Sequence, residues 1–428
     1  MKLRIIMKNN NILYIEQHSK NTLSPASPAK ILASLGNRIK TFVFLSILMP
    51  TSLFAADVPG FSSLQSAISD KNYQINDIQW TSPLTDIAPS GTIHGGSDND
   101  IRTLPSNADF NSILIPTRFF TTEVPDFSSL QSAISDNNYQ INLTADIQWI
   151  NPLTNIASSG TIHGGTGNDI RTLSSNAEFN AFSLESKQMY FVGNLNFEDF
   201  FMSKDRGSVF SVSYSTVHFA DGQVSFTSNS IRRSDFGPIY GGAIYLNNSS
   251  FLNFERSTVS FIRNSANSSG ETYGGAIEIA NRSQAVFKDS TVIFSSNSAQ
   301  YGGAVHFADD SLGILSFEHS VVVFSTNLAN TAGGAIYAVN GSNVFFVDST
   351  VQFTSNTSLS GGALNLSKAA AFFSASTISF LRNTSVGGNG GAIFAANSSS
   401  VSFSNSTIEF STNFANKMAA NGGMGGAL

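Results

Sequence analysis

Four acidic residues stand within two positions of a regularly recurring phenylalanine, which makes them the first candidates for chemistry. They are Glu255, Asp289, Glu318 and Asp348. Carboxylates gathered on one face of a protein are what a polysaccharide lyase or hydrolase needs for acid–base work. The next phenylalanines of the series are followed by uncharged residues, however, so the chemistry would have no fixed partner. We therefore interpret the four acids as solvated corner residues and predict no catalytic residue.

Three histidines are the other candidates for a reactive or ligand-binding group. His94 and His163 occur in identical Ile-His-Gly-Gly segments, and His306 lies close to Asp309-Asp310. A histidine oriented by a carboxylate can act as a general base, but no nucleophile recurs here at a triad-like spacing. The alternative is a polar residue at a turn or on a surface loop, and we favour it for all three. We expect no metal ligand and no cofactor-binding residue.

The composition excludes several classes of protein and points to a β-rich, exported chain. The 428 residues contain no cysteine, which rules out disulfide staples, thiolate metal sites and a cysteine nucleophile. With 23 basic and 29 acidic residues the net charge is −6, which argues against a nucleic-acid partner. Only 12% of residues are charged while 41% are hydrophobic, so the chain is neither disordered nor typical of a helical cytosolic enzyme.

Residues 1–56 have the pattern of a secretory signal peptide with a long basic region. Seven lysines and arginines precede an apolar run over residues 41–49, and Ser52-Leu-Phe-Ala-Ala56 supplies small residues for cleavage. The alternative is a membrane anchor, which needs about 20 apolar residues, more than the run contains. We therefore expect export, and an exported chain without cysteine suits a Gram-negative envelope.

A duplicated segment follows the predicted signal peptide. The decapeptide that starts at Phe61 recurs at Phe127, and Ser-Gly-Thr-Ile-His-Gly-Gly starts at both Ser90 and Ser159. We interpret residues 57–122 as a cap-like, poorly packed first copy and 123–205 as the working N-terminal cap with the first repeats. In the second copy we expect a short helical turn over 130–134, a strand over 141–147 and another around 160–162. Such a segment suits the polar cap that a stacked-strand fold needs at its end.

Residues 206–428 are dominated by a repeat of about 30 residues. A Gly-Gly-Ala-(Ile/Val/Leu) block contributes the pairs Gly241 and Gly242, Gly274 and Gly275, Gly302 and Gly303, Gly333 and Gly334, Gly361 and Gly362, Gly390 and Gly391, and recurs at Gly425. Asparagine follows phenylalanine at i+3 in Phe226/Asn229, Phe261/Asn264, Phe294/Asn297, Phe324/Asn327, Phe353/Asn356, Phe380/Asn383 and Phe410/Asn413. A further phenylalanine lies seven residues before most of these, at Phe254, Phe287, Phe317, Phe346, Phe373 and Phe403.

The repeat predicts short strands rather than heptad helices. Ser, Thr, Val and Phe favour strands, whereas glycine pairs and asparagine break helices. The apolar residues also alternate with period two, so that Val259 and Phe261 point one way and Ser260 the other. One unit cannot bury its own apolar side chains, but stacked units can. Each strand then hydrogen-bonds to the equivalent strands of the units above and below, at a spacing of about 4.8 Å. The sequence therefore predicts an all-β fold, a right-handed parallel β-helix of the pectin-lyase-like type, with three short strands per rung and an N-terminal cap.

The corner residues of each repeat have predicted structural roles. The asparagine after the second phenylalanine should bond to neighbouring backbone or to the next asparagine, as stacked asparagine ladders do. The glycine pair should allow positive φ and close backbone approach at another corner. The stretches 264–272, 328–332 and 383–389 vary between repeats, and we expect them to be loops that contact partners.

The alternation of Gly-Gly-Ala-Ile and Phe-x-x-Asn motifs resembles the polymorphic outer-membrane proteins of chlamydiae, over about residues 124–428. The resemblance implies an autotransporter: a signal peptide, a β-helical passenger and a C-terminal membrane barrel. It implies a passenger at the outer membrane or cell surface, or secreted, of a Gram-negative bacterium. Its role would be adhesion to host cells or antigenic variation, without enzymatic activity.

The sequence departs from that family in its last residues. It stops at Gly425-Gly-Ala-Leu428, within a repeat, and no series of barrel strands follows. The expected partners are a host-cell surface receptor or other surface proteins, with possible self-association through an open last rung. Two alternatives stay open, a polysaccharide lyase or hydrolase built on a β-helix and a truncated, non-functional remnant.

Overall fold

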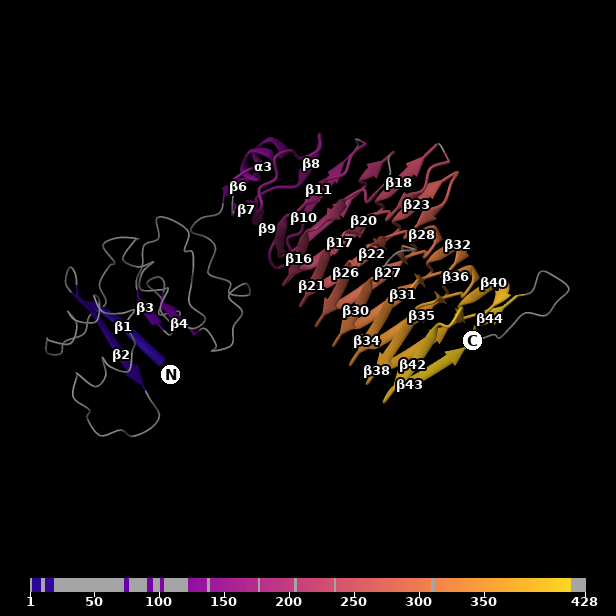
Figure 1. Cartoon of the computed structure of the whole chain (residues 1–428). Helices are drawn as coiled ribbons and strands as arrows, with labels where there is room; N and C mark the ends of the chain where they lie inside the picture. The colour runs from indigo at the N-terminus through magenta and orange to yellow at the C-terminus, as the bar shows by residue number, and fades with distance from the viewer. Residues whose placement is uncertain are drawn as a thin grey trace. The chain divides into compact units, whose positions relative to one another are not determined.

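The computed structural model describes residues 2–8, 12–18, 73–76, 91–94, 101–103 and 122–416, apart from 137–138, 176–177, 204–205, 235 and 309–311. The chain divides into two units, Met1–Phe120 and Thr121–Leu428, and each is described by itself (Figure 1). The predicted cleavage site after Ala55 or Ala56, the pair Asp309-Asp310 and the last glycine block lie outside the described residues.

The described residues of the first unit form two small sheets. Strands β1 (Lys2–Lys8) and β2 (Ile12–His18) pair antiparallel, whereas β3 (Tyr73–Asn76) pairs in parallel with β4 (Gly91–His94) and β4 pairs antiparallel with β5 (Ile101–Thr103). His94 ends β4. The β3–β4 register aligns Tyr73 with Gly91, and the second copy of the duplication repeats this register by aligning Tyr139 with Gly160.

The second unit opens with a cap built around the helix α3 (Phe127–Ala133). The Asp126 side chain caps this helix by accepting a hydrogen bond of 2.8 Å from the backbone N–H of Ser129. Phe127, Leu130 and Ala133, spaced along one helix face, are buried. The strand predicted over 141–147 is in fact two, because the chain leaves one sheet after Leu143 and enters the next at Ile147.

The rest of the unit is a parallel β-helix, as the repeats predict, in which each rung is one complete coil that passes through four sheets (Figure 1). Sheet I begins with β11 (Phe182–Glu185) and β15 (Phe210–Ser213) and continues with the strands that follow the glycine pairs: β20 (Ile244–Asn247), β25 (Ile277–Ile279), β29 (Val305–Phe307), β33 (Ile336–Val339), β37 (Leu364–Ser367) and β41 (Ile393–Ala396).

Sheet II holds the strands that contain the first phenylalanine of each repeat, together with three strands of the cap. They are β6 (Thr122–Val124), β7 (Tyr139–Leu143), β9 (Ser159–His163), β12 (Gln188–Val192), β16 (Thr216–Ala220), β21 (Phe251–Glu255), β26 (Gln284–Lys288), β30 (Ile314–Glu318), β34 (Asn343–Val347), β38 (Ala370–Ser374) and β42 (Ser400–Ser404).

Sheet III holds the strands that contain the second phenylalanine, preceded by two strands that have none. They are β8 (Ile147–Trp149), β10 (Arg171–Ser175), β13 (Leu195–Glu198), β17 (Gln223–Thr227), β22 (Thr258–Ile262), β27 (Thr291–Ser295), β31 (Val321–Ser325), β35 (Thr350–Thr354), β39 (Thr377–Leu381) and β43 (Thr407–Ser411).

Sheet IV follows the asparagine corner and corrects the prediction of three strands per rung. Its members are β14 (Phe201–Met202), β18 (Ser230–Arg233), β19 (Ile239–Tyr240), β23 (Ser265–Ser268), β24 (Thr272–Tyr273), β28 (Ser298–Tyr301), β32 (Leu328–Ala332), β36 (Thr357–Ser360), β40 (Thr384–Asn389) and β44 (Phe414–Ala415). The stretches 264–272, 328–332 and 383–389, expected to be loops, therefore consist largely of strand. Stacking with the rungs above and below supplies the backbone partners that these short, polar segments lack by themselves.

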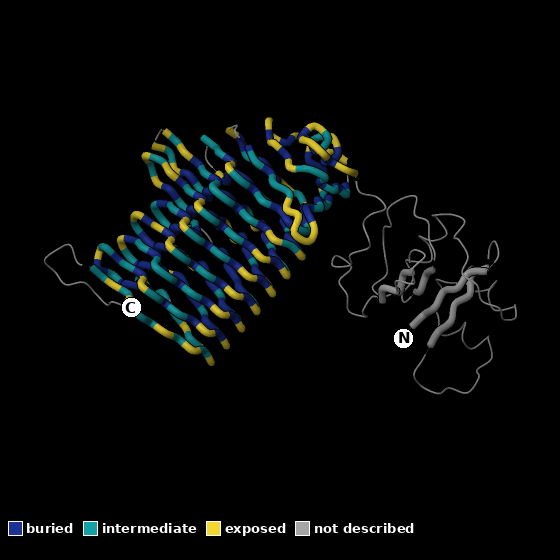
Figure 2. Tube along the Cα trace, turned by 180° about the vertical axis from the view of Figure 1, so that it is seen from behind, coloured by how far each residue is buried: buried dark blue, intermediate teal, exposed yellow. Residues whose placement is uncertain are grey.

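The core is a set of aromatic and aliphatic columns along the helix axis. In sheet II the rings of Phe254 and Phe287 stack with centroids 4.9 Å apart, and in sheet III those of Phe261 and Phe294 stack at 4.7 Å. The two columns meet edge to face, with 6.1 Å between the centroids of Phe254 and Phe261. Offset-stacked and edge-to-face contacts are the arrangements that aromatic rings favour. Figure 2 shows the result, in which buried residues alternate along the strands while exposed residues collect at the corners.

Candidate functional site

The corner between sheets III and IV contains a ladder of buried asparagines. The Nδ2 of Asn297 donates to Oδ1 of Asn327 at 3.0 Å and to the backbone oxygen of Phe261 at 2.9 Å. Its own Oδ1 accepts from the backbone N–H and the Nδ2 of Asn264, each at 3.0 Å. Asn297 thus joins three rungs, and the ladder runs through Asn229, Asn264, Asn297, Asn327, Asn356, Asn383 and Asn413.

The corner between sheets IV and I contains the glycine pairs, whose two members act differently. Gly274 has a φ of +61°, a left-handed conformation that an L-residue adopts only with strain. A Cβ on Gly275 would lie 2.1 Å from the backbone oxygen of Gly303 and 2.6 Å from the backbone nitrogen of Ser298. The second glycine therefore lets the corner backbone pack directly on the next rung.

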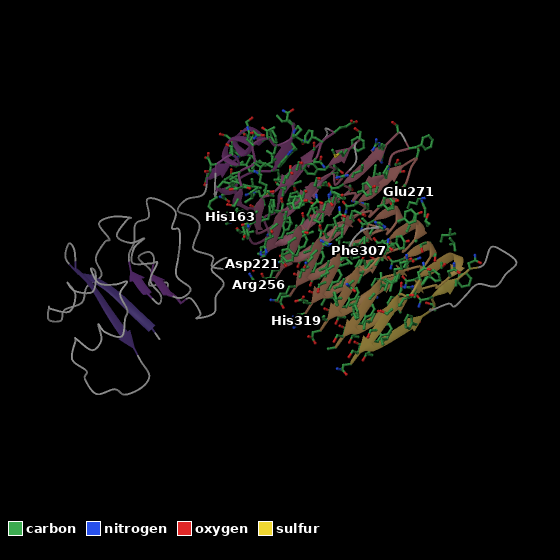
Figure 3. The ribbon with its side chains drawn as sticks, viewed as in Figure 1. His163, Asp221, Arg256, Glu271, Phe307 and His319 are labelled. Atoms are coloured by element: carbon green, nitrogen blue, oxygen red, sulfur yellow. The ribbon has the colours of Figure 1, made fainter. Side chains whose placement is uncertain are left out.

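The four acids considered as catalytic candidates fall into two columns at the corner between sheets II and III. Glu255 and Glu318 end their strands on either side of Lys288, whereas Asp289 and Asp348 occupy the left-handed corner residue with φ near +50°. Figure 3 shows Asp221, Arg256 and His319 following one another along this edge of the helix.

The carboxylates at this edge alternate with cations or with an imidazole. Arg256 donates to both oxygens of Asp221, at 2.7 and 3.0 Å, and also contacts the Glu255 carboxylate. The hydrogen bond that Arg256 donates to the Asp221 carboxylate raises the pKa of the Arg256 guanidinium. His319 lies between Asp289 and Asp348 at 3.8 and 3.7 Å. All of these side chains reach solvent, from 24% exposed for Glu255 to 57% for His319, so the ion pairs contribute little to stability and form a charged edge.

A second group of polar side chains, which sequence reasoning missed, is buried on the outer side of sheet I. Glu278 is fully buried, His306 is 2% exposed, and the Nδ1 of His306 lies 2.8 and 3.0 Å from the two carboxylate oxygens of Glu278. Both residues occupy the same repeat position, directly after the aliphatic residue of the Gly-Gly-Ala block. Aligning the repeats on that block would have placed them together, whereas the sequence analysis paired His306 with Asp309-Asp310.

Tyrosines that precede the glycine pairs cover this Glu278–His306 pair. The rings of Tyr240, Tyr273 and Tyr301 stack on successive rungs, 5.3 Å apart at each step, and the Tyr273 ring lies 4.8 Å from that of His306. Burial raises the pKa of Tyr273 and raises that of Tyr245 to about 12. Covered on its solvent side, the pair can stabilise the corner but offers a substrate no route to the imidazole.

His163 has a structural environment in the cap. Its Nε2 lies 3.2 Å from the Oε1 of Gln140 on the neighbouring strand β7, and burial lowers the pKa of its imidazole. Among the described residues no group of three or more His, Cys, Asp or Glu side chains is arranged to hold a metal ion. No helix in the described part of the chain is long and apolar enough to cross a membrane.

Comparison with known proteins identifies the type of repeat. Residues 321–339 and 377–396 each match the family model for the Chlamydia polymorphic membrane protein repeat. Each segment begins with a strand of sheet III, continues through sheet IV and the glycine pair, and ends in sheet I. No curated protein and no solved structure matches the chain. The chain therefore carries repeats of the chlamydial polymorphic membrane protein type.

Proposed function

We propose that this protein is exported to the surface of a Gram-negative bacterium, where it serves as a non-enzymatic adhesin or antigenically variable passenger. The observation that carries the proposal is the match of two complete sheet III–IV–I segments to the chlamydial polymorphic membrane protein repeat, a family of surface proteins. The partner would be a host-cell receptor or another surface protein.

The architecture supports the display of outward-facing segments on a rigid rod rather than catalysis. The inward positions of sheets II and III hold large apolar side chains in rung after rung, from Phe226 to Phe380, so the rod is rigid. The acids of the charged edge face Arg256, Lys288 or His319 and are open to solvent. A lyase or hydrolase would instead hold two carboxylates across a substrate cleft. The unbroken Phe and Asn columns also favour a folded, working protein over a decayed remnant.

Two measurements test this proposal. Antibodies raised against the repeat region should label intact bacteria, and external protease should remove that label. Beads coated with the full chain should bind cultured host epithelial cells more than beads coated with an unrelated parallel β-helix of equal length. Equal binding of the two bead types would refute adhesion, and release of unsaturated or reducing sugars from a polysaccharide would favour the enzyme instead.

A further inference from the structure

Sheet II presents a broad outward face on which most side chains are uncharged. From β12 to β42 the strands stack in register, and the first, third and fifth residue of each strand point away from the core. The first and third positions contain no acid, lysine or arginine in any of these strands. We call the outward surface of the strands β7 to β42 the sheet II face, and the placement of all these strands is described.

Aromatic side chains lie toward both ends of the sheet II face. The rings of Phe345 and Phe372 stack with their centroids 5.0 Å apart, and both side chains are only half-buried. Several rungs away, the ring of Tyr190, also half-buried, lies 5.8 Å from that of His218. Solvent-exposed aromatic rings on an otherwise uncharged surface are typical of a surface that another protein covers.

The charges of the sheet II face lie along one side, on the charged edge, and their sign alternates from rung to rung. The fifth strand position holds Glu255, Lys288 and Glu318 in successive rungs, and the corner after it holds Asp221, Arg256, Asp289 and His319. Lys288 is exposed and forms no ion pair with another described residue. Its charge is therefore available to a partner.

An alternating row of charges is complementary to the same row in reverse, provided that the reversal is centred between two rungs. A two-fold axis that lies along the strands, between β21 and β26, reverses the sheet II face in this way. It places Glu255 of each copy opposite Lys288 of the other, and Arg256 opposite Asp289. An axis through β21 or β26 themselves would instead place Arg256 or Lys288 opposite the same residue of the second copy.

The same axis gives the largest overlap of the two faces, because it passes through the middle of the ten strands from β7 to β42. With about 4.8 Å between strands and five residues in most strands, the overlap covers roughly 800 Å² of each copy, the amount that a stable interface of standard size buries. It also places Phe345 opposite Tyr190 and Asp221 opposite His319. The contact would thus have an uncharged, partly aromatic centre and a charged rim, as protein interfaces do.

We propose that two copies of this chain associate through their sheet II faces, antiparallel to each other and related by a two-fold axis between β21 and β26. A different protein is the weaker fit, because a row of alternating sign matches neither an acidic nor a basic surface but does match its own reversal. Within one chain the charges also pair, as Arg256 does with Asp221 at 2.7 Å, which keeps the free face soluble. The inference concerns assembly and does not depend on the adhesive function.

The first test measures the mass of the full chain by sedimentation equilibrium, which should give twice the mass of one chain at micromolar concentration. Lys288→Glu should weaken association roughly tenfold to a hundredfold, because two carboxylates then face each other across the axis. Exchanging both charges, with Glu255→Lys and Lys288→Glu together, should restore association. Arg263→Glu is the matched control, because Arg263 is an exposed arginine at the corner of sheets III and IV, and it should associate like the wild type. A monomeric wild type, or equal association of the Lys288→Glu variant, would overturn the proposal.

The second test uses two single-cysteine variants to measure the antiparallel register. Gln188 and Asn343 are about 24 Å apart in one chain, because five rung spacings separate β12 from β34, but they lie opposite each other in the proposed dimer. The natural chain has no cysteine, so a short bismaleimide should join co-expressed Gln188→Cys and Asn343→Cys chains. Either variant alone should stay unlinked, and both should keep the wild-type unfolding midpoint. A mixture without cross-links, or efficient linking of either variant to itself, would overturn this interface and leave the adhesive function to its own tests.

Discussion

At the scale of single residues, buried polar side chains join neighbouring rungs through specific hydrogen bonds. Asn297 illustrates it, since all of its side-chain donors and acceptors are used by backbone or side chains of the neighbouring rungs. Unmet hydrogen-bonding groups in a dry interior are costly, so the ladder is an obligate feature of each rung rather than an added contact.

Asn297→Ala is expected to lower the free energy of unfolding by roughly 3 kcal/mol or more, because it leaves several buried partners unsatisfied. Guanidinium unfolding followed by circular dichroism would measure the change. Asn267→Ala, an exposed asparagine in β23, is the control and should change stability by less than about 0.5 kcal/mol. Similar effects of the two substitutions would contradict the ladder.

The contributions of Glu278 and His306 to stability are expected to depend on each other. His306→Leu removes the imidazole from a fully buried carboxylate and should destabilise the protein by about 3–5 kcal/mol. The double variant Glu278→Leu/His306→Leu should cost clearly less than the sum of the two single variants, since both polar groups are then gone. Additive losses in unfolding experiments would mean that the two side chains do not interact.

His163, in the cap, is expected to make the stability of the protein depend on pH. Burial lowers the pKa of His163, so the unfolded chain binds the proton more readily than the folded chain. The free energy of unfolding should therefore fall as the pH drops below about 6.5, the pKa of an unperturbed histidine. His163→Gln should show a shallower fall between pH 7.5 and pH 5 in parallel unfolding curves. Superimposable pH profiles would show that this imidazole does not contribute.

At the scale of strands and corners, the sequence predicted most where the side chains alternate clearly. Val259 and Phe261 lie inward as their spacing indicates, because an apolar–polar alternation has only one way to face a core. Sheet IV escaped prediction because strands such as Ser265–Ser268 place only a small residue, Ala266, inward. Nothing local distinguishes such a segment from a loop, and its strand conformation comes from pairing with adjacent rungs. Likewise, Glu278 and His306 are 28 residues apart in sequence, and they become neighbours in space only because one rung has about that length.

Gly275→Ala tests the glycine corner. The added Cβ would meet backbone atoms of Gly303 and Ser298, which cannot move without separating the rungs, so we expect a loss of several kcal/mol or failure to fold. Gly167→Ala is the matched control, because nothing lies within 4 Å of its Cβ position and only its φ of +64° opposes the change. That control should cost only about 1–2 kcal/mol. A loss for Gly275→Ala no larger than that for Gly167→Ala in thermal unfolding would contradict the close packing of this corner on the next rung.

At the scale of the whole molecule, the β-helix separates three groups of residues by rung and corner. The charged edge follows the corner of sheets II and III, the tyrosine-covered Glu278–His306 pair is buried over sheet I, and the strand pair β19–β24 extends sheet IV. Because every rung contacts mainly its neighbours, an extension such as β19–β24 can be added to two adjacent rungs without disturbing the columns elsewhere. This explains how constant Phe and Asn columns coexist with variable outward segments.

All of these assignments depend on the in-register stacking of successive rungs, and paired cysteines measure it most directly. The natural chain has no cysteine, so every disulfide must come from the introduced pair. Ser225 and Ser260 face outward as direct neighbours in sheet III, within the separation that a disulfide bridges. Ser225→Cys/Ser260→Cys should therefore cross-link almost completely under mild oxidation, as judged by mass spectrometry. Gln223→Cys/Ser260→Cys, offset by two residues, should stay mostly reduced, and efficient cross-linking of the offset pair instead of the aligned one would contradict the fold.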